Sequence, residues 1–292
     1  MAMITLKDSL KIAKDHKFAV GAFNAIDSHF IDAIFSSAEE LQSPVILNVA
    51  EVHLKHINIE DISTYIKYKA KKTSIPVTLN LDHGFSFDTI KKAIECGFTS
   101  IMFDGSHLSY ERNIEMTQSI VQYCRGFGVS VEAELGAVGG DEGGDLHGSA
   151  DEALYTRVEQ AEEFVRLTGI DALAVAIGNS HGNYKGTPKL DFERLIDINS
   201  VAGIPLVLHG GSGLSVQDFK SAINYGICKV NFYTGMSQAA IASIARNISN
   251  PEFMKKYDHY LIMMLQAQRE ISSSVTAQMR IYSSEHKANL YE

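Results

Sequence analysis

The feature that most constrains this chain is a recurring set of short, apolar, β-branched runs bounded by turn or capping residues. We expect eight of these runs to be strands: Ala19–Phe23, Val45–Val49, Val77–Leu81, Ser100–Phe103, Ser130–Glu134, Ala172–Ile177, Leu206–Leu208 and Lys229–Phe232. Their starts lie 23 to 42 residues apart, which leaves room for a helix in every gap. Eight strand-then-helix units predict an α/β fold, a parallel (β/α)8 or TIM barrel.

Helical periodicity within the gaps supports this architecture. It is clearest over His29–Leu41, Phe87–Cys96, Glu111–Cys124 and Ala153–Leu167. The rival is a doubly wound open sheet, which usually carries a glycine-rich dinucleotide loop after its first strand, whereas here that strand runs into Phe23-Asn24-Ala25. The 292 residues fit one barrel domain spanning residues 1–292. After Asn250-Pro251 we expect a C-terminal helical extension (about 250–292), with a long helix over about 252–281 that packs on the barrel or on a partner subunit.

Composition narrows the class of protein. The formal net charge of −9 argues against general attraction to nucleic acid or anionic membranes. No apolar run approaches the roughly 20 residues of a membrane helix, and the N-terminus lacks a signal peptide's apolar stretch. Three well-separated cysteines suggest neither a disulfide framework nor a thiolate zinc site. We therefore expect a soluble cytoplasmic protein with neither nucleic acid nor membrane as partner.

Polar residues recur at the carboxyl ends of six successive expected strands, the face on which such barrels carry their chemistry. Three of these residues are His83, His181 and His209, and three protein ligands with one open position are typical of a catalytic zinc site. A single histidine at such a place is more often an ordinary hydrogen-bonded residue, so the prediction rests on all three. His107 is assigned to a loop, and the ordinary interpretation is preferred for the remaining histidines, among them His16, His53, His56, His147 and His286.

Carboxylates occupy the same face. Asp82 adjoins a predicted ligand and is our first choice for an acid/base group. Asp104 and Glu134 are interpreted either as ligands of a second metal position or as hydrogen-bonding anchors for the histidines. Glu142 lies on the glycine-rich segment 136–148, which is either a lid that carries a proton-transfer group or a loop with a solvated charge.

A phosphate site is predicted next to the metal. The seventh strand runs into Gly210-Gly211-Ser212-Gly213, followed by Ser215 and Asp218 in the spacing of a capping box. The eighth leads into Asn231-Phe232-Tyr233-Thr234, and barrel enzymes frequently bind phosphate in the loops after these two strands. The glycine motif alone is also compatible with a tight turn that binds no ligand. Phosphate beside a metal suggests a phosphorylated substrate.

Together, the motifs LDHG (81–84), DGSH (104–107), VEAELGxxGG (131–140), AIGxxHG (176–182), PLVLHGGSG (205–213) and KVN (229–231) resemble those of class II fructose- and tagatose-bisphosphate aldolases. The resemblance spans nearly the whole chain. It implies that His83, His181 and His209 bind Zn2+, that Asp82 exchanges the proton of the hydroxyl formed from the aldehyde, and that Glu142 exchanges a proton with dihydroxyacetone phosphate. It also implies a second metal position at Asp104 and Glu134, a monovalent cation (Na+ or K+) near Gly182 and Gly210, and substrate binding by Gly182, Gly210, Gly211, Ser212, Asn231 and Thr234.

The implied activity is metal-dependent, reversible cleavage of a ketose phosphate or bisphosphate to dihydroxyacetone phosphate and an aldehyde, by a homodimer or homotetramer. A divalent ion stabilises the enediolate left by cleavage between C3 and C4, so no Schiff-base lysine is required. Lys229, the one lysine near a strand terminus, is expected at the wrong end. Ala50 and Tyr233 depart from the family pattern at the pocket wall, and Arg280 is the candidate for a distal phosphate, with a surface cation as the plainer interpretation.

Two other functions compete with this one. A metallohydrolase on a similar barrel would be favoured by a His-x-His pair on the first strand, which is absent. A non-catalytic sugar-phosphate-binding or stabilising subunit would be expected to have lost metal ligands or acid/base groups. Because Asp82, Glu142 and the three histidines are all present, we favour the aldolase.

Overall fold

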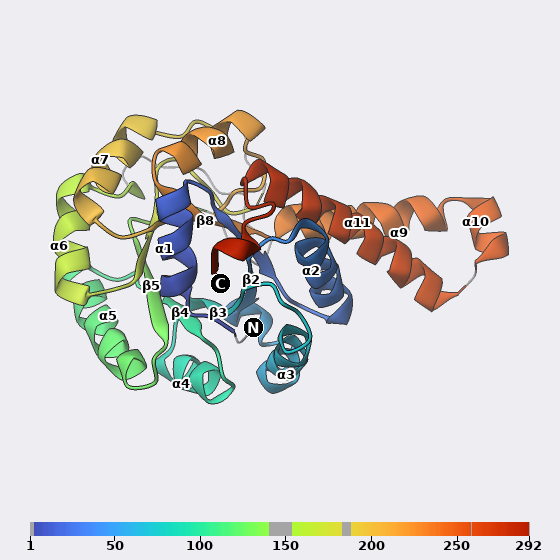
Figure 1. Cartoon of the computed structure of the whole chain (residues 1–292), viewed down its shortest axis with the longest axis horizontal. Coiled ribbons are helices and arrows are strands. Elements are labelled where there is room, and N and C mark those ends of the chain that lie inside the picture. Colours follow the sequence, from blue (N-terminus) through green and yellow to red (C-terminus); the bar gives the residue numbers. More distant parts are fainter. Residues whose placement is uncertain (1–2, 140–153, 183–187, 258, 292) are drawn as a thin grey trace.

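The computed structural model describes residues 3–139, 154–182, 188–257 and 259–291, and it has eight parallel strands closed into a barrel (Figure 1). Each strand pairs with its neighbours in sequence, and β1 pairs with β8 to close the ring. The strands are β1 (Val20–Asn24), β2 (Val45–Ala50), β3 (Val77–Gly84), β4 (Ser100–Phe103), β5 (Ser130–Leu135), β6 (Ala172–Val175), β7 (Leu206–Leu208) and β8 (Ile227–Phe232). The predicted (β/α)8 barrel with C-terminal helices is confirmed.

Helices α2 to α9 follow the strands around the outside of the barrel, α1 precedes the first strand, and α10 and α11 come last in the chain. The helices are α1 (Leu6–His16), α2 (Ser28–Leu41), α3 (Ile59–Ala70), α4 (Phe87–Glu95), α5 (Tyr110–Arg125), α6 (Val158–Thr168), α7 (Phe192–Ala202), α8 (Val216–Asn224), α9 (Thr234–Ile248), α10 (Pro251–Lys256) and α11 (Tyr260–Ile281), with short 3-10 turns η1 (Glu51–His53) and η3 (Ala288–Tyr291). Many begin at a capping side chain that accepts a backbone N–H of the first turn, such as Asp27, Ser86 and Ser109. These caps satisfy N–H groups of the first turn that would otherwise lack a partner within the helix.

Two apolar layers enclose the sheet. Outward-facing strand residues pack against the surrounding helices in the main core. Inward-facing residues near the amino ends of the strands form a second cluster with Leu6, Leu10 and Ala13 of α1, which lies across that end of the barrel (Figure 1). Leu6 and Leu10 are fully buried, and burial of each contributes roughly 1.5–3 kcal/mol to folding. The amino end of the barrel is thus filled with apolar side chains, and polar residues occupy the carboxyl end.

Several predicted boundaries are wrong in instructive ways. β3 continues beyond Leu81 to Gly84 and takes His83 into the strand, while β6 ends at Val175, before Ile177. β8 begins at Ile227, so Lys229 lies inside the strand and its buried side chain belongs to the barrel interior. The long helix expected over 252–281 is divided into α10 and α11, and Tyr257, at the C-terminal cap of α10, has the non-helical angles φ −136° and ψ 53°.

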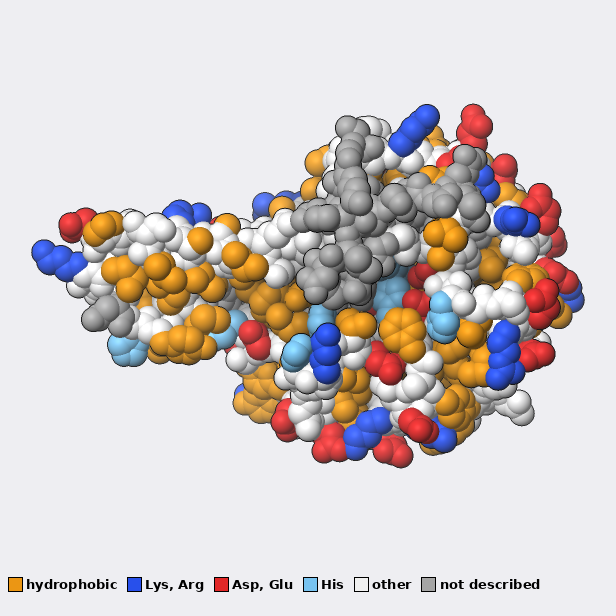
Figure 2. All heavy atoms as spheres, turned by 180° about the vertical axis from the view of Figure 1, so that it is seen from behind, with side chains coloured by type: hydrophobic (Ala, Val, Ile, Leu, Met, Phe, Trp, Pro, Cys, Tyr) orange, Lys and Arg blue, Asp and Glu red, His pale blue; other side chains and the backbone are white. Residues whose placement is uncertain are grey.

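The C-terminal helices form an arm. α11 packs against α2 and α9, and the far ends of α9 and α11 extend with α10 well beyond the barrel (Figure 1). Apolar side chains cover much of this arm on the face shown in Figure 2. Within the part of the chain that the structure describes, no helix is both long enough and apolar enough to cross a membrane.

Candidate active site

Three histidines from separate parts of the chain meet at the carboxyl end of the barrel. His83 lies in β3, His209 directly follows β7, and His181 lies in the segment after β6. One ring nitrogen of each lies within 4.8 Å of those of the other two, and all three residues are at least nine-tenths buried. Histidine side chains gather near the middle of this face in Figure 2. Three neutral imidazole donors at this spacing suit a divalent ion such as zinc.

The backbone at His83 departs from ordinary strand geometry. Its φ is +45°, in the left-handed region that residues other than glycine rarely adopt. The β3–β4 register also shifts between Leu81 and Gly84. Strained backbone of this kind concentrates at functional sites, where surrounding contacts hold it in place. Here the bulge turns the imidazole of His83 toward Asp104 on one side and His209 on the other.

Carboxylates fix two of the three rings. His83 Nδ1 lies 2.7 Å from Asp104 Oδ2, and His209 Nε2 lies 2.9 Å from Glu132 Oε1. These bonds leave His83 Nε2 and His209 Nδ1 facing one another at 2.9 Å. A carboxylate on the far nitrogen is the usual way in which proteins orient a metal-binding histidine.

The electrostatic environment keeps the rings of His181 and His209 neutral. Burial, followed by the neighbouring histidines, lowers the pKa of His181 well below its ordinary value. Burial, His83 and Lys229 do the same for the pKa of His209. A neutral ring retains a lone pair for a metal ion, so these two histidines are held in the state that metal binding requires.

Asp104 and Glu134 lie beside His83 and form a second group of convergent donors with it. Burial opposes ionisation of Asp104, but the hydrogen bonds from His83 and Ser106 outweigh it and hold the pKa of that carboxyl well below its usual range. Burial and the charge of Asp104 raise the pKa of Glu134 to about 8. Glu134 Oε1 accepts a bond from the Val138 N–H, and Oε2 has no hydrogen-bond partner among the described residues.

Asp82 is fully buried at the end of β3, one residue before His83. Its Oδ1 accepts a hydrogen bond of 2.9 Å from Asn231 Nδ2. Its Oδ2 has no hydrogen-bond partner in the part of the chain that the structure describes. Asn231 Nδ2 also lies 3.1 Å from His209 Nδ1, so the amide links the carboxylate to the histidines. One fixed oxygen and one open oxygen are what a positioned acid/base group needs.

A small pocket adjoins the histidines, and the structure brings all the predicted substrate-binding residues around it. Its lining consists of Asn24, His181, Gly182, Gly210, Gly211, Ser212, Asn231, Phe232, Tyr233 and Thr234. Gly182 and Gly210 have φ of +73° and +65°. At Gly210 a Cβ would lie 2.3 Å from the Ser180 carbonyl oxygen, so no larger residue fits there without a backbone shift.

The two helices that follow the loops differ in what their first turns can bind. Ser215 and Asp218 form the predicted capping box at the start of α8, which uses their backbone N–H groups internally. α9 begins at Thr234 inside the pocket, and no side chain caps its N-terminus within the described residues. The positive end of a helix dipole attracts anions, and of these two helices it is α9 whose first turn is not used by a capping side chain.

Sequence reasoning missed one residue of the pocket lining, Asn24, and one residue that packs against the lining, His53. Asn24, the last residue of β1, is 1% exposed, and neither atom of its amide has a hydrogen-bond partner among the described residues. His53, to which no role was assigned, lies in η1 with its ring 5.0 Å from that of Tyr233, which lines the pocket. The signal for both was position: each follows or ends a strand on the carboxyl face.

Other predicted residues lie elsewhere. His107 is exposed on the β4–α5 loop. Arg280 lies in the last turn of α11 with Nε 3.6 Å from Glu285. Nearby, the Tyr282 carbonyl accepts from the N–H of Ala19 at the amino end of β1, so Arg280 is remote from the histidines of its own chain. Glu142, His147 and most of the glycine-rich segment lie outside the described residues.

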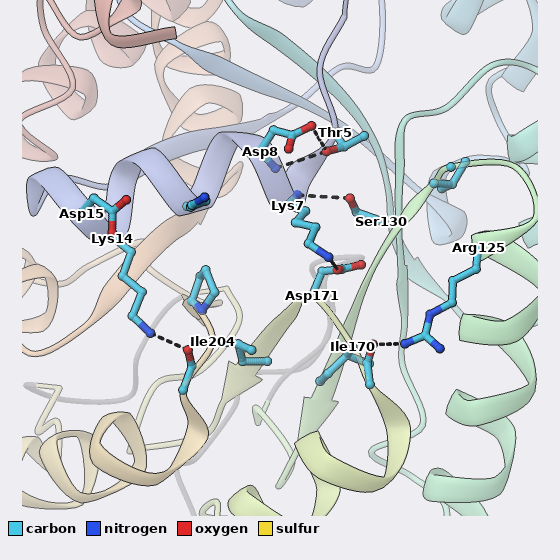
Figure 3. A pocket seen from close by; sticks show the side chains of 16 residues that line it. Thr5, Lys7, Asp8, Lys14, Asp15, Arg125, Ser130, Ile170, Asp171 and Ile204 are labelled. Carbon is cyan, nitrogen blue, oxygen red and sulfur yellow. Dashed lines mark hydrogen bonds and ion pairs between the residues drawn. The ribbon is translucent and has the colours of Figure 1, made fainter.

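A cleft of about 680 Å³ lies at the opposite end of the barrel, between α1 and the loops before β5, β6 and β7 (Figure 3). Its charged side chains serve the fold. Lys14 Nζ donates to the Gly203 carbonyl at 2.9 Å and Arg125 to the Gly169 carbonyl at 3.2 Å, at the C-terminal ends of α7 and α6. Cations stabilise helix C-termini, and this face of such barrels serves stability. The active-site candidate is therefore the histidine face.

Comparisons with known proteins agree with this geometry. The model of the class-II fructose-bisphosphate aldolase family matches residues 4–287, so the chain belongs to that family, and the predicted family resemblance is confirmed. Fructose-bisphosphate aldolases of Staphylococcus epidermidis and Staphylococcus aureus are each 41% identical over 255 residues, covering 86% of this chain and 87% of theirs.

Two solved structures resemble the whole chain. The YdjI aldolase from Escherichia coli K12 has a TM-score of 0.86 and 31% identity, covering 98% of this chain and 99% of that one. A Coccidioides immitis protein assigned as a fructose-1,6-bisphosphate aldolase has a TM-score of 0.85 and 32% identity, covering 96% of both chains. The fold of this chain thus matches theirs over nearly the whole of each chain.

Proposed function

We propose that this protein catalyses the reversible aldol cleavage of a ketose phosphate or bisphosphate, giving dihydroxyacetone phosphate and an aldehyde. Membership of the class-II fructose-bisphosphate aldolase family supports aldol cleavage of a ketose bisphosphate. The observation that carries the proposal is the proximity of three features: the three histidines, the Asp82 oxygen without a described hydrogen-bond partner, and the pocket lined by Asn24 and the segments 181–182, 210–212 and 231–234.

The donor set fits one zinc ion at His83, His181 and His209. All three imidazoles are buried. The pKa values of His181 and His209 are lowered, and carboxylates orient the rings of His83 and His209. Three such ligands match a catalytic zinc site, in which a fourth position would be open to the substrate. When bound, a divalent ion supplies Lewis-acid stabilisation of the negative charge that develops on the substrate oxygens. His83 also belongs to the group with Asp104 and Glu134, which we propose as a second metal position.

Asp82 is proposed to exchange the proton of the hydroxyl that becomes the aldehyde. Asn231 holds Oδ1, so Oδ2 is aimed and free, and full burial keeps competing water away. Glu142, which lies outside the described residues, is proposed from sequence alone to exchange the proton on the carbon of dihydroxyacetone phosphate. Two separate groups would then serve the two proton transfers of the reaction.

The phosphate of dihydroxyacetone phosphate is assigned to the pocket of Gly182, Gly210, Gly211, Ser212, Asn231 and Thr234. Glycines let the backbone approach the anion closely, and the uncapped start of α9 adds the favourable end of a helix dipole. A monovalent cation, Na+ or K+, is proposed near Gly182 and Gly210, where the Ser180 carbonyl lies against Gly210. Such an ion would offset part of the phosphate charge.

The aldehyde half of the substrate is proposed to contact His53 and Tyr233. Their rings pack against each other at the pocket rim, and burial lowers the pKa of His53, so this wall is aromatic and uncharged. Ala50, at the end of β2, leaves the adjoining wall without a hydroxyl. The relatives named fructose-bisphosphate aldolase support a bisphosphate, and tagatose- and fructose-type sugars are both candidates.

A coupled assay for dihydroxyacetone phosphate over a panel of ketose mono- and bisphosphates tests the proposal. We expect release from at least one member with purified protein and zinc. Release from none of them would refute the aldolase and favour a non-catalytic sugar-phosphate-binding subunit.

The arm is proposed to mediate self-association into a homodimer or homotetramer. Its exposed apolar side chains would otherwise face water: Ile241, Ile248, Tyr260, Leu261 and Leu265 are 37–77% exposed. Contiguous apolar surface of this kind marks protein interfaces. We expect the double substitution Ile248→Asp, Leu261→Asp to yield a 32.1-kDa monomer by light scattering, with Ile196→Asp on α7 as control. An unchanged mass would exclude this interface.

We further propose that residues 1–292 form one domain and that the protein works in the cytoplasm. The family match from residue 4 to residue 287 supports the first proposal. The three cysteines are free and buried, which fits a reducing compartment and supports the second.

A further inference from the structure

A buried ion pair lies within the barrel, next to the histidines. Lys229, on β8, has its Nζ 2.6 Å from Glu132 Oε2 on β5, and both side chains are fully buried. The other oxygen of the same carboxylate, Oε1, lies 2.9 Å from His209 Nε2. Lysine, carboxylate and imidazole thus form one continuous chain of hydrogen bonds that ends at a histidine of the proposed metal site.

We propose that Lys229 is a positioning residue for metal binding: through Glu132 it fixes the ring orientation and tautomer of His209. This inference rests on the proposed role of His209 as a metal ligand. Lys229 does not line the pocket, and its hydrogen bond is made to Glu132, so we assign its control of the ring orientation and tautomer of His209 to that carboxylate.

The hydrogen-bonding capacities of the three groups dictate the tautomer. The lysine ammonium only donates and an ionised carboxylate only accepts, so a Glu132 paired with Lys229 must receive a proton donor from His209. His209 Nε2 therefore carries the hydrogen, and the lone pair remains on Nδ1. The opposite side of the ring agrees, because Asn231 Nδ2, a donor, lies 3.1 Å from Nδ1. Nδ1 is also the atom that faces His83 Nε2.

Stability alone does not account for a charged pair at this place. A buried ion pair is often no more stabilising than apolar residues of similar volume, because both charges must be desolvated. The amino-terminal part of the same barrel interior is filled with apolar side chains such as Val20, Ile46 and Val207. The charged pair replaces such packing only where the barrel interior approaches His209. The same contact argues against a Schiff-base role for Lys229, because its Nζ is hydrogen-bonded to Glu132 and is fully buried.

A double-mutant cycle tests the inference. Zinc affinity is measured by chelator competition for the wild type, Lys229→Met, Glu132→Gln and the double variant. Loss of an outer partner of a metal-binding histidine typically weakens metal binding about 10- to 100-fold, which we expect for each single variant. In Glu132→Gln, Lys229 attracts the amide oxygen and turns the amide NH2 toward His209, which favours the wrong tautomer. Without the lysine, the amide oxygen is free to accept from His209, so the double variant should bind zinc more tightly than Glu132→Gln.

The controls separate a positioning role from a structural one. Lys67→Met removes a lysine whose Nζ bonds to the Cys96 carbonyl on the outside of the barrel, and it should leave zinc affinity unchanged. Circular dichroism and denaturant unfolding of the metal-free proteins report folding independently of zinc. A Lys229→Met protein that is less stable but binds zinc within about threefold of the wild type would overturn the inference.

Two further outcomes also decide it. If Lys229→Met does not fold, tighter zinc binding by the double variant than by Glu132→Gln supports the inference, and equal binding overturns it. If His209→Gln binds zinc as tightly as the wild type, the proposed metal site itself is wrong and the inference falls with it. Loss of zinc in His209→Gln without loss in Lys229→Met overturns the inference alone.

Discussion

Replacement of Asp82 by asparagine isolates the proposed acid/base group from the rest of the site. The two side chains have nearly the same shape, and the amide oxygen of asparagine can still accept the 2.9 Å hydrogen bond from Asn231. The change therefore removes only the ability of the second oxygen to take and return a proton. The proposed metal ligands and the phosphate pocket keep their residues.

The size of the effect follows from the burial of this carboxylate. A positioned acid/base group usually contributes about 10²- to 10⁴-fold to the rate. Asp82 is fully buried, so water has poor access to replace it. We expect kcat to fall about 10³-fold, which corresponds to about 4 kcal/mol of transition-state stabilisation. Zinc content and KM should change little, because Asp82 is proposed neither as a metal ligand nor as a phosphate-binding residue.

Two assays on the same protein distinguish the two proton transfers of the reaction. Dihydroxyacetone phosphate release measures cleavage, and exchange of deuterium from D2O into dihydroxyacetone phosphate measures proton transfer at its carbon. Because Asp82 is assigned to the aldehyde side, Asp82→Asn should lose cleavage but retain exchange, whereas Glu142→Gln should lose both. Asp61→Asn, an exposed position on α3, is the control. Cleavage within about threefold of the wild type would refute the assigned role.

Two further predictions concern the glycine loop and the buried carboxyl of Glu134. Gly210→Ala places a Cβ 2.3 Å from the Ser180 carbonyl oxygen, so we expect at least a tenfold rise in KM. The control is Gly203→Ala, at φ +69° with open space around the Cβ, which should change KM less than about twofold. Equal effects of the two substitutions on KM would contradict the close-packing argument. The pKa of Glu134, raised by burial and by Asp104 to about 8, means that the metal-free folded protein holds a proton that the unfolded chain releases above about pH 4.5. Its contribution to stability is therefore lost as the pH rises toward and through 8, and the difference in unfolding free energy between wild type and Glu134→Gln should fall by about 2 kcal/mol from pH 6 to pH 8. A difference that does not vary with pH would contradict this environment for Glu134.

Much of the fold was predictable because its signals are local. The strands are short, mostly apolar runs, and many of the helices are amphipathic segments that begin at a capping residue such as Asp27 or Ser109. The order of these elements then leaves few topologies other than a closed parallel barrel. Prediction failed at boundaries that depend on distant contacts. The extension of β3 through His83 requires a bulge against β4, and no feature of the segment 81–84 alone indicates a left-handed residue there.

The proposed site was predictable to the extent that it follows strand ends. Position after a strand identified the histidines, Asp82 and the glycine loop, and the structure brings these residues together. The role of Lys229 was missed for the opposite reason. Its neighbour across the barrel, Glu132, is 97 residues away, and only the closed sheet brings the two side chains within 2.6 Å of each other. Asn24 shows the same limitation, since an asparagine at a strand end is unremarkable until its pocket is known.

The central claim is that His83, His181 and His209 hold the divalent ion on which cleavage depends. The most direct measurement is the rate of dihydroxyacetone phosphate release from chelator-treated protein before and after zinc is restored, for the wild type and for His209→Ala. We expect the treated wild type to lose activity and regain it with zinc, and His209→Ala to remain inactive at the same zinc concentration. Full activity of the wild type without metal, or of His209→Ala with it, would contradict the account.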